Sequence, residues 1–417
     1  MTARSNLNRA NIKSILLGVV ALFLIVALIM YPETAFQSSL EGLKIWWEVV
    51  FPALLPFFVA SEILMGFGVV HFLGVLLEPL MRPLFRVPGP GAFVMAMGLA
   101  SGYPIGAKLT TRLREQQLIT RSEGERLVSF TNTADPLFMF GAVAVGFFHD
   151  VTLGVTLAIA HYTASLLTGF AMRFHDPHGE SSPAIERSNE FILLRAAKAM
   201  HRARLQDGRS LGRLIGDSVM NSVNTLLMVG GTIMIFSVII QVMTLINVTA
   251  VLTQGIGIFL ALFGFPVQLA EPIVSGLFEI TLGSQVASQF KDGLPPVYVM
   301  AVVSAIIAWS GLSVHAQVAS LLSSTDIRYT PYLFARLLHG LLAGVITLIV
   351  WNPVQRYLLA SDVAIPTFLQ QIPANTVSNL WSRIEFIGMR VLVLLLVLIA
   401  IAMVIKLVQT ILERKRY

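Results

Sequence analysis

The chain has 417 residues, of which 55% are hydrophobic and 12% are charged, with a mean hydropathy of +0.76. Because soluble domains carry about 25% charged residues, this composition indicates a polytopic membrane protein. The net charge of +6 is small and the basic residues gather in loops, which fits membrane orientation better than a nucleic-acid partner, so none is expected. The absence of cysteine excludes disulfides and thiolate nucleophiles.

The apolar pattern predicts about eight transmembrane helices, each near the 20 or so residues that cross a bilayer. They cover residues 12–31, 48–69, 127–148, 151–172, 217–245, 297–321, 332–352 and 386–408. No small-residue cleavage site follows the first apolar run, so it is interpreted as an uncleaved span. Segments 91–112 and 267–290 are also apolar, but each contains polar residues with Gly or Pro near its middle.

Loop charge predicts how these segments lie. Arg4, Arg9 and Lys13 place the N-terminus in the cytoplasm by the positive-inside rule, and residues 414–416 do the same for the C-terminus. Basic loops flank residues 91–107, so this segment is predicted to enter and leave on the cytoplasmic side as a re-entrant hairpin. Loops poor in Lys and Arg flank 267–290, which predicts a second hairpin that opens to the outside.

The two halves of the chain share one order: span, amphipathic stretch, hairpin, span, span. Three spans per half is an odd number, so the second copy must be inverted, and such repeats with broken helices are typical of secondary transporters. The predicted domains are an N-terminal transmembrane helix and outer loop (1–47), a first repeat (48–172), a basic cytoplasmic linker (173–213), an inverted second repeat (214–352), and an outer loop with a C-terminal transmembrane helix (353–417).

The first hairpin holds the polar break SGYPIGAK. A break at membrane depth is tolerated where the freed backbone lines a wet cavity, so Ser101, Gly102, Tyr103 and Pro104 are candidate substrate contacts. Spacing by four along 98, 102 and 106 also fits a small-residue packing face. Lys108 at the hairpin mouth either snorkels to the interface or supplies a counter-charge at the rim.

The following span holds the break TNTADP. Asn132 and Thr133 are candidate substrate contacts. Asp135 either caps the helix that restarts at Pro136 or binds a coupling ion or proton, because an acidic group at membrane depth is a functional candidate.

The second repeat offers FEITLG and WSGLSVHAQ. Glu279 needs a partner, a cation or a proton, and Thr281 lies beside it. His315 either forms structural hydrogen bonds or relays a proton, and Trp309 either packs or stacks on a flat ligand. The remaining candidate substrate contacts here are Ser310 and Ser313. No cofactor or metal site is expected, and no nucleophile–base arrangement indicates an enzyme.

The segments GLASGYPIGAK, SFTNTADPLFMFG, FEITLG and WSGLSVHAQ resemble those of the YlbJ-type sporulation integral membrane proteins, over a region from about Val49 to the C-terminus. That family carries two nucleoside-recognition or gate domains, similar to the core repeats of concentrative nucleoside transporters. The resemblance implies an all-α inverted-repeat fold and a secondary transporter that moves dipicolinic acid across the outer forespore membrane by alternating access. It assigns substrate or ion contacts to Ser101, Tyr103, Asn132, Thr133, Asp135, Glu279, Ser310, Ser313 and His315.

Dipicolinate is a flat aromatic dianion near neutral pH. Hairpin amides, hydroxyls and Asn132 could hold its carboxylates, and Trp309 or Tyr103 could stack on its ring. Asp135 and Glu279 would repel it unless protonated or bound to a cation, so they are expected to hold a coupling proton or cation. The alternatives are a membrane scaffold for spore maturation and a transporter of another solute such as a nucleoside. The expected location is the cell membrane or outer forespore membrane. The oligomeric state is not predicted, and a homo-oligomer is possible.

Overall fold

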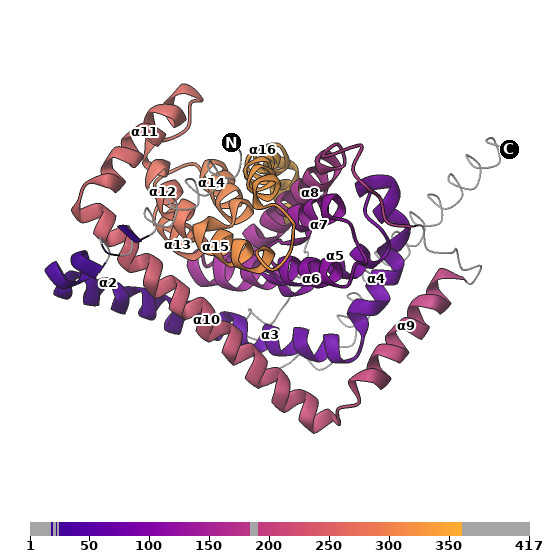
Figure 1. Ribbon diagram of the computed structural model, residues 1–417. Helices are drawn as coiled ribbons and strands as arrows, with labels where there is room; N and C mark the ends of the chain where they lie inside the picture. Colours follow the sequence, from indigo (N-terminus) through magenta and orange to yellow (C-terminus); the bar gives the residue numbers. More distant parts are fainter. Residues whose placement is uncertain (1–17, 20–21, 23–24, 184–190, 361–417) are drawn as a thin grey trace, which may run out of the picture.

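The computed structural model describes residues 18–19, 22, 25–183 and 191–360, and the regular structure in these ranges is helical (Figure 1). The predicted all-α class is thereby confirmed. Span 386–408 and much of span 12–31 lie outside the described residues, as do all residues after Ala360. Within the described part, five helices are long and apolar enough to cross a membrane: Pro32–Gly66, Thr152–Met172, Leu211–Leu245, Pro296–Leu322 and Tyr329–Arg356.

A continuous helical run pairs with α10 (Leu211–Leu245), the longest α-helix among the described residues. The run comprises α2 (Pro32–Ile45), the π-helical turn η1 (Trp46–Val50) and α3 (Phe51–Gly66), and it packs along α10. The sequence predicts an outer loop at 32–47, whereas the structure has a helix, because this stretch has its own packing partner. A Cβ on Gly42 would lie 3.1 Å from the Met234 Cα, and Trp46 Nε1 donates to the Leu226 carbonyl at 2.8 Å.

The first repeat contains one helical hairpin and one broken helix. After α4 (Val69–Leu80) and η2 (Met81–Phe85), hairpin 1 is formed by α5 (Pro90–Ser101) and α6 (Ile105–Glu115), joined at residues 102–104. Helix α7 (Arg121–Thr131) ends at the TNTADP break, and the chain resumes as η3 (Phe138–Phe147) before α8 (Thr152–Met172). The expected hairpin and the expected break are both present.

The second repeat follows the same order. Helix α9 (Ile192–Asp207) of the linker packs on α4, and α10 leads to α11 (Val248–Leu262). Hairpin 2 comprises the 3₁₀ turn η4 (Val267–Leu269), α12 (Ala270–Phe278) and α13 (Ile280–Ser288), with its tip at Glu279. Helix α14 (Pro296–Trp309) breaks at Ser310 and continues as α15 (Gly311–Leu322).

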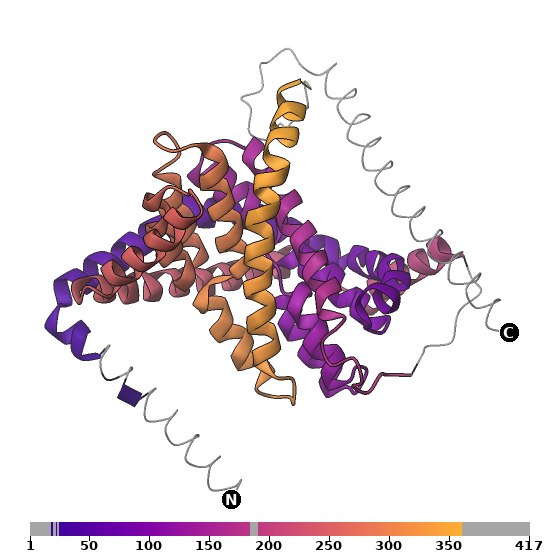
Figure 2. The ribbon, with the colours of Figure 1, turned by 90° about the horizontal axis from the view of Figure 1, so that it is seen from above.

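Helix α16 (Tyr329–Ala360) joins the two repeats, because it packs against α8 of the first and α14 of the second. It is seen nearly end-on in Figure 1 and along its length in Figure 2. Helix α10 instead runs lengthwise in Figure 1, so it crosses the bundle rather than following α16. The broken helices and hairpins therefore lie between a crossing helix on one side and α16 on the other.

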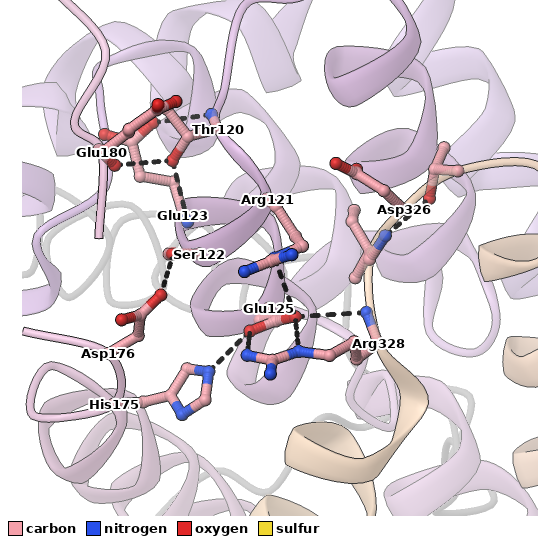
Figure 3. Close-up of polar contacts among 12 residues, drawn as sticks. Thr120, Arg121, Ser122, Glu123, Glu125, His175, Asp176, Glu180, Asp326 and Arg328 are labelled. Carbon is pink, nitrogen blue, oxygen red and sulfur yellow. Dashed lines mark hydrogen bonds and ion pairs between the residues drawn. The ribbon is translucent and has the colours of Figure 1, made fainter. Parts of the chain in front are cut away.

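A cluster of ion pairs around Glu125, Arg328 and Asp326 links the two repeats (Figure 3). We call the end of the bundle that carries this cluster the basic end. Glu125 of α7 is fully buried; its Oε1 accepts from Arg328 Nε at 2.7 Å and its Oε2 accepts from Arg328 Nη2 at 2.9 Å. His175 Nε2 lies 2.6 Å from the same Oε2. Arg114 of α6 pairs with Asp326 through two bonds of 2.7 and 2.9 Å. These ion pairs hold the 323–328 loop of the second repeat against helices α6 and α7 of the first repeat.

Acidification is expected to weaken the interaction of Glu125 with Arg328 and His175. Burial opposes ionisation of Glu125, but the hydrogen bonds from Arg328 and His175 outweigh it and hold the pKa of this carboxyl below its usual 4.5. A depressed pKa contributes stability above pH 4.5, and this contribution is lost as pH falls through the folded-state value. Glu125→Gln should therefore cost roughly 2 kcal/mol at neutral pH and almost nothing in strong acid.

Thermal unfolding of the purified protein across pH measures this difference. The exposed carboxylate Glu271 provides the control, since Glu271→Gln should leave the pH profile of the wild type unchanged. Equal pH slopes for the wild type and Glu125→Gln would show that the cluster does not stabilise the fold.

Candidate functional site

The two hairpin tips and the two helix breaks meet at one cavity of about 80 Å³, which we call the inner cavity. Each of the four polar segments contributes to its wall, although they are far apart in the sequence. The sequence-predicted residues that line it are Tyr103, Pro104, Asp135, Glu279, Thr281 and Ser313. Packing of the two repeats therefore brings together side chains that lie as much as 210 positions apart.

Two carboxylates face the inner cavity, one from each repeat. Asp135 accepts a hydrogen bond from the Phe138 amide at 2.8 Å, and Glu279 accepts one from the Leu282 amide at 2.8 Å. Each carboxylate thus caps a helix that begins at the break. Both are at least 95% buried, and within the described ranges neither forms an ion pair with a basic side chain. Such groups need a proton or a bound cation in a membrane interior.

A larger cavity of about 680 Å³ adjoins the inner cavity on the side of the basic end, and we call it the vestibule. Ser101 and Lys108 line it, as do the acidic Glu62 and the pair Asp207 and Arg209. The vestibule falls within the range of about 300–1,000 Å³ typical of small-molecule sites, whereas the inner cavity is far smaller. Six residues line both cavities and so form their junction: Phe58, Tyr103, Pro104, Thr225, Met228 and Gln317.

Two candidate residues of the first break lie behind the cavities. Asn132 is fully buried, where its side-chain oxygen accepts from the Ala107 amide at 3.3 Å and its nitrogen donates to the Tyr332 hydroxyl at 3.0 Å. The Thr133 hydroxyl contacts His161 Nε2 in a very short hydrogen bond. In this structure both side chains hold the break in place.

The second break is held in a similar way. Trp309 Nε1 donates to the Leu277 carbonyl at 3.1 Å, and its ring centroid lies 4.2 Å from that of His315. His315 in turn lies 2.7 Å from the Tyr329 hydroxyl and 3.0 Å from the Trp309 carbonyl. Ser310 has a left-handed backbone with φ of 76° and is fully buried. Of the candidates in this break, Ser313 faces the inner cavity.

The glycines of hairpin 1 serve close packing. A Cβ on Gly98 or Gly106 would clash with the Thr131 carbonyl at the first break. Gly102 has φ of 70° and lies against the Asp135 carboxylate. The small-residue interpretation is therefore confirmed, and it places the hairpin backbone directly on the TNTADP break.

Arg336 of α16 bonds to several parts of the site but belongs to none of the four polar segments. Its side chain is fully buried, and Nη1 donates to the Asn132 carbonyl at 2.9 Å. Nη2 donates to the Tyr103 hydroxyl at 3.0 Å and to the Ala308 carbonyl. The available signal was an arginine inside the predicted span 332–352, where a charge is costly and functional by default.

Comparison with solved structures finds structures of CNTnw in different states. The chain aligns with a variant of CNTnw in its intermediate 3 state at 14% identity, over 82% of this chain and 86% of that chain, with a TM-score of 0.47. It also aligns with CNTnw in an inward-facing substrate-bound state at 14% identity, over 81% of this chain and 86% of that one, with a TM-score of 0.40.

Sequence comparison gives closer relatives. Residues 47–176 match the Gate family, described as nucleoside recognition. An uncharacterized protein of Alkalihalophilus pseudofirmus is 30% identical over 132 residues, covering 30% of this chain and 28% of that protein. The sporulation integral membrane protein YlbJ of Bacillus subtilis is 49% identical over 348 residues, covering 83% of this chain and 85% of YlbJ. The chain therefore belongs to the family of the sporulation integral membrane protein YlbJ, as its break motifs predict.

Proposed function

We propose that this protein is a secondary transporter that moves dipicolinate, a small aromatic dicarboxylate, across the outer forespore membrane by alternating access. The observation that carries this proposal is the meeting of both hairpin tips and both breaks at one cavity that lies beside a vestibule. Inverted repeats with broken helices bind their substrates at such meeting points. Membership of a sporulation family supports a solute of spore formation as the cargo.

The vestibule is the proposed place of the solute in this conformation. Its volume suits a small molecule, and the ring of Tyr103 at its inner end offers a surface on which a flat aromatic acid can stack. The positive charges of Lys108 and Arg209 in the vestibule lining are matched by the negative charges of Glu62 and Asp207. A dicarboxylate would therefore be held by local contacts near Lys108 rather than by a strongly positive cavity.

The inner cavity is the proposed place of the coupling ion or proton. It is too small for an aromatic acid, and its two carboxylates would repel a dianion that approached them unneutralised. A proton or cation on Asp135 or Glu279 removes this repulsion, so loading of the inner cavity favours loading of the vestibule. By the positive-inside rule the basic end faces the cytoplasm, which makes this an inward-open conformation.

Uptake of labelled dipicolinate into proteoliposomes tests the function. Imposed proton and sodium gradients are compared, with protein-free liposomes as the control, and accumulation under one of them is expected. Absence of uptake under every gradient would overturn the proposal in favour of a membrane scaffold for spore maturation. Uptake of a nucleoside in place of dipicolinate would refute the proposed substrate.

A further inference from the structure

The side chain of Tyr103 lies at the junction of the vestibule and the inner cavity, since it lines both. It belongs to the tip of hairpin 1, yet its hydroxyl is bound by the second repeat and by α16. The hydroxyl donates to the Ile307 carbonyl at 2.9 Å and accepts from Arg336 Nη2 at 3.0 Å. The ring at the junction is therefore held across the boundary between the repeats.

Arg336 is itself held at the ends of two broken helices. Its guanidinium donates to the Asn132 carbonyl at the end of α7 and to the Ala308 carbonyl in the last turn of α14. The final carbonyls of a helix lack intrahelical partners and carry the negative end of its dipole. This accounts for a fully buried guanidinium that forms no ion pair among the described residues.

The planar fork of the guanidinium suits this arrangement. One nitrogen reaches the first repeat, and the other reaches both α14 and Tyr103, which a lysine ammonium with its single nitrogen cannot reproduce. The Arg336 Cζ also lies 5.7 Å from the centroid of the Tyr103 ring and 5.9 Å from that of Tyr332. Ring and hydroxyl of Tyr103 are thus both oriented by one side chain.

We infer that Arg336 is a positioning residue that keeps Tyr103 across the junction and so separates the inner cavity from the vestibule. The hydrogen bond to Tyr103 has to break before solute or ion passes between the two cavities. This inference rests on the proposed transport function. The test below needs neither substrate nor gradient, so the role of Arg336 and the proposed transport function can each fail without the other.

The absence of cysteine from the chain allows a direct measurement of access. Ser313→Cys places a thiol at the inner cavity, and Ser101→Cys places one at the vestibule. The rate of labelling by a membrane-impermeant thiol reagent is measured for each in nanodiscs. Adding Tyr103→Phe removes the hydroxyl with its hydrogen bonds to Ile307 and Arg336 but keeps the ring. It should raise labelling at the inner position at least about tenfold, which is the effect of losing the bond to the charged group alone. Labelling at the vestibule should stay the same.

Tyr332→Phe is the matched control. It removes another hydroxyl beside Arg336, one that accepts from Asn132 and not from the guanidinium, so it should not speed labelling at Ser313→Cys. Arg336→Lys should speed it, and the Tyr103→Phe result stands by itself if that variant does not fold. Unchanged labelling in Tyr103→Phe, or equal acceleration by Tyr332→Phe, would overturn the inference.

Discussion

Gly98→Ala is expected to destabilise the protein by about 3 kcal/mol, at the upper end of what overpacking costs. The added Cβ would clash with the Thr131 carbonyl, which is backbone and cannot move aside as a flexible side chain can. Hairpin 1 would have to lift away from the TNTADP break, and the wall of the inner cavity would move with it. Thermal unfolding of the purified protein, monitored by loss of the monodisperse species, measures the change.

Gly216→Ala is the matched control for this substitution. Gly216 lies in helix α10, is exposed, and has no neighbouring atom within 4 Å of an added Cβ. Alanine there should be neutral or stabilise the helix by up to about 1 kcal/mol, because glycine is a poor helix former. Equal unfolding temperatures for the two variants would show that hairpin 1 does not pack on the break as described.

Asp135→Asn and Glu279→Gln are each expected to weaken gradient-driven accumulation of substrate strongly while leaving exchange across the membrane intact. The amide keeps an acceptor for the Phe138 or Leu282 N–H, so the helix cap persists and the protein folds. What is lost is the ability to take up a proton or cation. Accumulation should fall roughly 5–150-fold, the usual range of a coupling between two binding sites.

Accumulation under a gradient and exchange without one are measured on the same proteoliposomes. Glu271→Gln alters an exposed carboxylate on the same hairpin and should accumulate substrate like the wild type. If both inner-cavity variants accumulated substrate normally, the coupling role of Asp135 and Glu279 would be excluded. Loss of exchange together with accumulation would assign the carboxylates to the substrate path instead.

Much of this architecture could be read from the chain because its signals are local. Apolar runs define helices by length, and prolines and glycines mark where helices stop. The breaks at residues 102–104, 132–135 and 310 are visible in the sequence for that reason. The helix at 32–45 is not predicted from the sequence, because its polar residues indicate a loop; in the structure it packs along α10.

The assignment of roles within each break could not be read in this way. Asn132 and Asp135 stand three positions apart, yet Asn132 bonds to Tyr332 behind the site whereas Asp135 faces the inner cavity. The direction of each side chain depends on how the broken backbone turns and on which distant helix fills the space beside it. A polar motif therefore identified the right segments but not the residues within them that face a solute.

The sequence by itself determined the membrane class, the positions of the hairpins and breaks, and the family, since these depend on composition, periodicity and motif. Only the tertiary structure decided that the tips converge on one cavity, that a vestibule lies beside it, and that Arg336 links the ends of the two broken helices to Tyr103. The physical reason is distance along the chain. Arg336 finds its partners 204 and 233 residues away, at helix ends that come together only when the two repeats pack against α16.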